Sequence, residues 1–182
     1  MFRDKFKNED IFLSLKDRKI SWKQRLLELR PRIKEDKLYS YYIDVTATCL
    51  ELIKVSYSLG NESNNIFEYF KEGLHYYGLS YTENDGIFTT IDYLSLAVLF
   101  ENRKEEFIDD VKILFDKYVQ YSEEDESVQD GYIETLALYL LEGQVENFRS
   151  RLEYLNMIGN DADSVIEAQK FWYYAHSEAS WY

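Results

Sequence analysis

The sequence contains very few of the residues that build loop-rich folds, disulfide frameworks and metal sites. Its 182 residues include one cysteine, one proline, two histidines and seven glycines. The single cysteine, Cys49, cannot form an internal disulfide, and together with His75 and His176 it cannot supply a three-histidine or multi-cysteine zinc site. The shortage of glycine and proline argues against a β-sandwich and against a glycine-loop nucleotide enzyme.

Motifs for catalysis, export and membrane insertion are also missing. We find no phosphate-binding loop, dinucleotide fingerprint, HExxH or GxSxG motif. The first residues, MFRDKFK, are charged and lack an apolar core, so we expect no signal peptide. The longest uncharged apolar runs, 93–100 and 135–141, are far shorter than the ~20 residues that span a bilayer. We therefore expect a soluble, cytoplasmic protein.

Acidic residues, by contrast, are abundant and unevenly placed. The chain has 34 Asp and Glu against 21 Lys and Arg, a net charge of −13. Residues 1–37 carry 12 basic and 7 acidic residues, a net of +5, and residues 38–182 carry 9 and 27, a net of −18. The stretch 83–134 alone has 15 acidic and 4 basic residues, a net of −11. This charge disfavours binding to nucleic acid or to an anionic membrane and favours a basic partner; a solvated surface tuned for solubility is the alternative.

The spacing of apolar residues predicts an all-α fold. Between Phe12 and Ile33 they recur at steps of three, four and seven, which places them on one side of a helix that Pro31 should end or kink near Arg30. The run 93–100 is apolar on all sides and should form a central, buried helix. The other expected helices cover residues 38–59, 63–77, 91–100, 105–121, 131–141, 145–157 and a last segment from Asp161 or Asp163.

These elements predict a multi-helix bundle of about eight helices, arranged as helical hairpins in two packed halves. Turn-forming residues cluster between Leu79 and Thr90. We therefore expect an N-terminal half of residues 1–80 and a C-terminal half of residues 81–182.

Several groups of polar residues resemble catalytic or metal sites, but each lacks an essential part. Asp109-Asp110-Val111-Lys112 resembles the carboxylate–lysine set of metal-dependent nucleases, yet it lies in a helical pattern rather than on a strand. The acids between Asp125 and Asp130 lack the glycine and the final glutamate of a calcium loop. Cys49 lies on an apolar helix side, where cysteine behaves as a small hydrophobic residue. We therefore expect no catalytic, metal or cofactor site, and no enzyme.

Four segments in order along the chain resemble the PoNi immunity proteins, the cognate antitoxins of PoNe polymorphic nuclease effectors. They are the charged start RDKFKNEDIF at 3–12, the helix end YSLG at 57–60, the buried helix LSLAVLF at 94–100 and the aromatic tail FWYYAHSEASWY at 171–182. The tail, which matches a WY-x-x-H-x-x-A-x-W pattern, is the most specific of the four.

The resemblance implies an all-α, two-part, non-enzymatic protein that binds a secreted DNase and blocks its active site. The charge pattern agrees, because a nuclease cleft must hold a polyanion and an acidic protein can occupy it instead. The candidate contacts are the acids of the most acidic stretch: Glu83, Asp85, Glu123, Glu124, Asp125, Glu126 and Asp130. The alternative is a helical adaptor or regulatory module with another basic protein partner.

Overall fold

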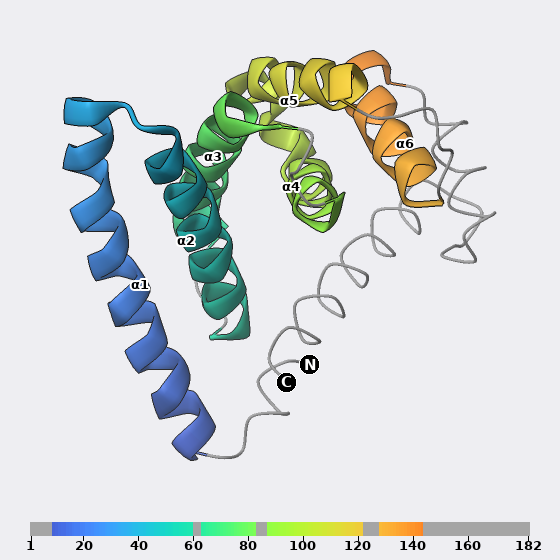
Figure 1. Ribbon diagram of the computed structural model, residues 1–182. Coiled ribbons are helices and arrows are strands. Elements are labelled where there is room, and N and C mark those ends of the chain that lie inside the picture. The colour runs from blue at the N-terminus through green and yellow to red at the C-terminus, as the bar shows by residue number, and fades with distance from the viewer. Residues whose placement is uncertain (1–8, 60–62, 83–86, 122–127, 144–182) are drawn as a thin grey trace. The chain divides into compact units, whose positions relative to one another are not determined.

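A computed structural model gives the fold, in which short connections join helices throughout the described part of the chain (Figure 1). The described residues are 9–59, 63–82, 87–121 and 128–143. Within these ranges there is no strand, so the predicted all-α class is confirmed. The chain divides into two compact units, Met1–Ser80 and Tyr81–Tyr182.

The first unit contains three helices, with the middle one packed against both of the others. They are α1 (Glu9–Asp36), α2 (Tyr39–Ser58) and α3 (Ser63–Ser80). Helix α2 contacts α1 along one side and α3 along another. The core between α1 and α2 is formed by fully buried apolar side chains: Leu26, Leu29, Ile33, Val45, Cys49 and Leu52.

Helix α2 is buried on more than one side, which explains its composition. The spacing in the sequence predicts an inward stripe that includes Val45, Cys49 and Leu52, and all three are buried. Ile53 and Val55 are buried as well, although they lie outside this stripe. A helix between two neighbours needs apolar residues on both contact sides, so its pattern is broader than that of a surface helix.

Pro31 does not end α1, so the expectation that the helix ends near Arg30 is wrong. The helix continues to Asp36 and stops at Lys37, whose φ of 46° is left-handed and whose N–H donates to the Ile33 carbonyl oxygen at 3.2 Å. Proline removes one backbone hydrogen bond. Leu29 and Ile33, on either side of Pro31, are 1% and 5% exposed, and their burial outweighs that loss.

Two other helix boundaries also differ from the sequence prediction. Helix α3 passes through Gly78 and reaches Ser80, because Tyr77 and Ser80 are both buried and the Ser80 hydroxyl donates to the Tyr77 carbonyl at 3.3 Å. The next helix begins at Ile87 rather than Ile91. Burial of Tyr77 and Ser80 therefore extends α3 beyond Gly78.

The described part of the second unit is built around one apolar helix. Its elements are α4 (Ile87–Leu99), the 3₁₀ helix η2 (Glu101–Glu106), α5 (Ile108–Tyr121) and α6 (Val128–Glu142). From Tyr93 to Val98 every side chain of α4 is buried, which confirms the predicted central helix. Helix α6 contacts both α4 and α5.

Helix α5 has the predicted amphipathic pattern but begins later than expected. Phe107, Val111, Leu114 and Tyr118 are buried at steps of three and four. The expected start at Glu105 is wrong, because residues up to Glu106 form the 3₁₀ helix η2. The two helices expected after residue 144 lie outside the described residues.

Replacing Pro31 with alanine tests whether the proline lowers the stability of α1. Pro31 is exposed, so P31A should restore a backbone hydrogen bond without opening a cavity. We expect the free energy of unfolding to rise by about 1–3 kcal/mol, measured by urea denaturation followed by circular dichroism. The exposed neighbour Arg32→Ala serves as the control and should change stability by less than about 0.5 kcal/mol. A P31A variant no more stable than this control would contradict the explanation.

Candidate partner-binding surface

The charge of the chain separates along the boundary between the two units. Residues 1–80 carry 14 basic and 12 acidic residues, a net of +2, whereas residues 81–182 carry 7 and 22, a net of −15. The second unit therefore holds the whole acidic surplus. A basic protein would be attracted to this unit more strongly than to the first.

Most of the predicted contact residues lie outside the part of the chain that the structure describes. These are Glu83, Asp85 and the run Glu123–Glu126. Asp130 lies within α6. The choice of these seven residues stays a prediction.

A contact between two tyrosine rings connects the starting points of the two acidic segments. Tyr81 and Tyr121 have ring centroids 6.4 Å apart, and Tyr81 is buried. Glu83 follows Tyr81 by two residues, and Glu123 follows Tyr121 by two residues. The ring contact therefore joins two described residues that directly precede the acidic segments in the sequence. Sequence spacing alone gives no sign of this contact.

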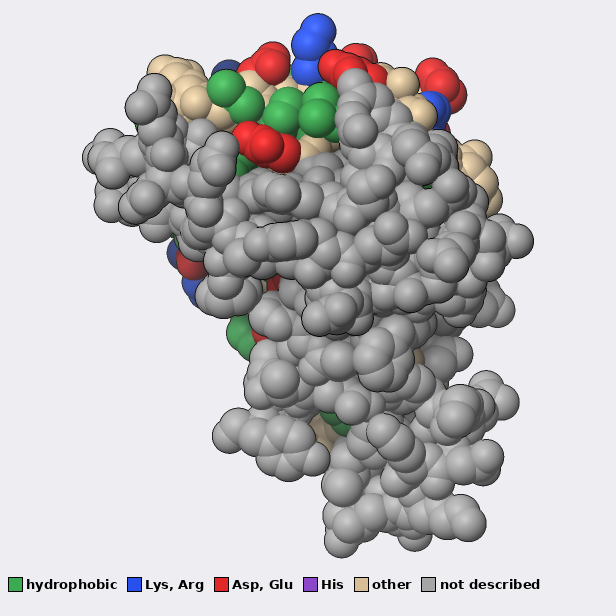
Figure 2. Space-filling view, turned by 90° about the vertical axis from the view of Figure 1, so that its right-hand side faces the viewer, with side chains coloured by type: hydrophobic (Ala, Val, Ile, Leu, Met, Phe, Trp, Pro, Cys, Tyr) green, Lys and Arg blue, Asp and Glu red, His purple; other side chains and the backbone are tan. Residues whose placement is uncertain are grey.

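The outward side of α5 adds acidic residues that sequence reasoning did not select. Asp109 and Asp116 are exposed, and their separation of seven residues places them on one side of α5, whereas the exposed Glu105 lies in η2 before it. Ile113, on the same side, is 39% exposed. Described side chains at the upper edge of Figure 2 likewise mix apolar, acidic and basic types.

A short hydrogen bond fixes α6 to the segment before α5. The Tyr139 hydroxyl donates to Glu101 Oε2 at 2.6 Å, a distance typical of a charge-assisted bond. Burial, together with this bond and the charge of Glu101, raises the pKa of Tyr139 well above that of a free phenol. The phenol therefore remains a proton donor and holds α6, with Asp130 at its start, in place.

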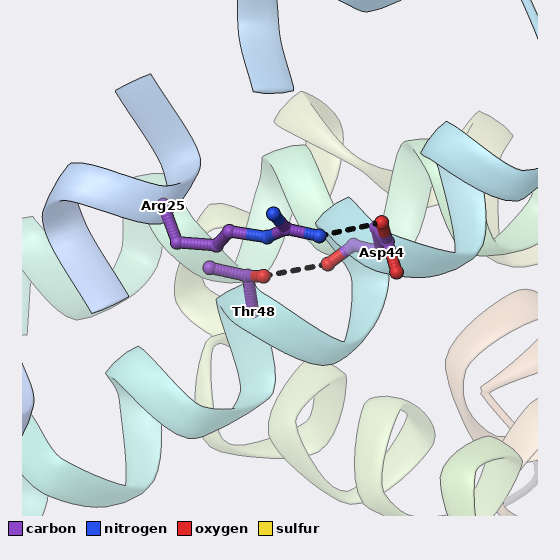
Figure 3. A network of polar contacts seen from close by, with 3 residues as sticks. All are labelled: Arg25, Asp44 and Thr48. Carbon is purple, nitrogen blue, oxygen red and sulfur yellow. Dashed lines mark hydrogen bonds and ion pairs between the residues drawn. The ribbon is translucent and has the colours of Figure 1, made fainter. Parts of the chain in front are cut away.

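Polar contacts in the first unit join its helices. Arg30 on α1 donates from Nε and Nη2 to both carboxylate oxygens of Glu72 on α3, at 2.8 and 2.6 Å. Arg25 on α1 donates to Asp44 Oδ2 at 2.9 Å, and the Thr48 hydroxyl donates to the Asp44 backbone carbonyl at 2.6 Å (Figure 3). The bond to Glu72 raises the pKa of Arg30. These charges hold the helices together and are less suited to binding a partner.

Neither Cys49 nor the acidic pair on α5 forms a reactive centre in the described structure. Burial raises the pKa of the Cys49 thiol far above its ordinary value, so the thiol stays neutral, as predicted for a small hydrophobic residue. Asp109 is exposed on a helix and Asp110 is half-buried. Within the described residues, no group of three His, Cys, Asp or Glu side chains could hold a metal ion. No helix in the same part of the chain is both long and apolar enough to cross a membrane.

Comparison with known proteins gives one family. The model described as the N-terminal part of the PoNe immunity protein (PoNi) matches residues 3–112, well over half of the chain. This range includes α1 to α4, η2 and the start of α5. No curated protein and no solved structure matches the chain.

Removing the Tyr139 hydroxyl should weaken the second unit. Tyr139→Phe loses a bond to a carboxylate and leaves Glu101 without its donor, so we expect the free energy of unfolding to fall by about 1–2 kcal/mol. Urea denaturation of the full chain measures this change. Tyr121→Phe removes an exposed hydroxyl and provides the control, with an expected change below about 0.5 kcal/mol. Equal stability of the two variants would show that the bond to Glu101 contributes nothing.

Proposed function

Because the chain belongs to the PoNe immunity protein (PoNi) family, we propose that it neutralises a secreted antibacterial DNase by covering the basic active-site cleft of that toxin. Immunity proteins of this family bind a cognate nuclease effector. The main support for binding at a basic active-site cleft is the net charge of the second unit, which is −15 against +2 in the first. The all-α fold supplies the rigid helices on which an acidic surface can be displayed.

Electrostatics gives a physical reason for inhibition by occlusion. A nuclease must bind a polyanion, so its cleft carries Lys and Arg side chains. An acidic surface competes for the same cleft, and its charge also accelerates encounter with the toxin. Inhibition then needs only tight, stoichiometric binding. In this proposal the protein acts in the cytoplasm of the toxin-producing cell, without catalysis, metal or cofactor.

The two acidic segments after Tyr81 and Tyr121 are the proposed centre of this surface. They contain Glu83, Asp85 and Glu123–Glu126, and they follow two tyrosines whose ring centroids lie 6.4 Å apart. Asp130 follows in the first turn of α6. Acids from two separate parts of the sequence can thus face one cleft.

Reversing two charges in the second segment tests the surface directly. The double variant E123K/E124K should weaken binding to the purified effector encoded beside this gene by at least about tenfold at low salt, measured by calorimetry. The loss should shrink at about 0.5 M salt, because counter-ions screen the interaction. The same variant should protect cells that express the effector less well than the wild type.

The control must alter total charge equally at other positions. D36K/E134K replaces exposed acids on α1 and α6 and also moves the net charge from −13 to −9. Similar weakening by both variants would mean that overall charge, not this surface, drives binding. If neither variant changes affinity or its salt dependence, the acidic segment is not in the interface. Failure of the wild type to bind or to protect would favour an adaptor with another basic partner.

Replacing Tyr121 tests whether the contact between the Tyr81 and Tyr121 rings matters for binding. Tyr121→Ser removes the ring that contacts Tyr81 and leaves every acidic residue in place. We expect the affinity for the effector to fall by about five- to tenfold, because the segments lose pre-organisation. Tyr121→Phe keeps the ring and should bind like the wild type. Equal affinity of the Ser and Phe variants would exclude a role for the ring contact.

A further inference from the structure

We draw no further inference here: the strongest candidate, the exposed apolar row of Leu13, Ile20 and Leu27 on helix α1, carries nothing because no feature of the described structure shows what covers it.

Discussion

Burial of one helix on several sides is the constraint on which each unit of this protein depends. Helix α2 contacts both α1 and α3, and α4 is buried at every position from Tyr93 to Val98. A helix of this kind cannot remain in water, so its neighbours must cover it. Because these neighbours must cover the buried helix, α1 continues past Pro31 and α3 continues past Gly78. The residue types at both positions favour the end of a helix.

Polar contacts at the edges of these cores add orientation. Arg30 connects α1 to Glu72 on α3 through a two-point bond, and Tyr139 connects α6 to Glu101 through a short one. The carboxylates in both contacts are only partly exposed to water, which makes the bonds stronger than an exposed ion pair. The apolar cores supply most of the stability, and these contacts fix how neighbouring helices lie against one another.

The two units differ in net charge, and the proposed function assigns toxin binding to the second. The first unit is nearly neutral and places several of its charges in contacts between helices, such as Arg25 with Asp44. The second unit carries a net charge of −15 on residues 81–182, and a protein that competes with DNA for a nuclease needs such an excess.

The sequence by itself determined the helical class, the amphipathic pattern of α5 and the buried centre of α4, because periodicity records which sides of a helix avoid water. It also located the acidic surplus and indicated the family. Only the tertiary structure decided that α1 survives Pro31, since the burial of Leu29 and Ile33 depends on α2. The contact between Tyr81 and Tyr121 likewise joins residues forty positions apart. No local pattern predicts it, because a contact at that separation depends on how the helices between them pack.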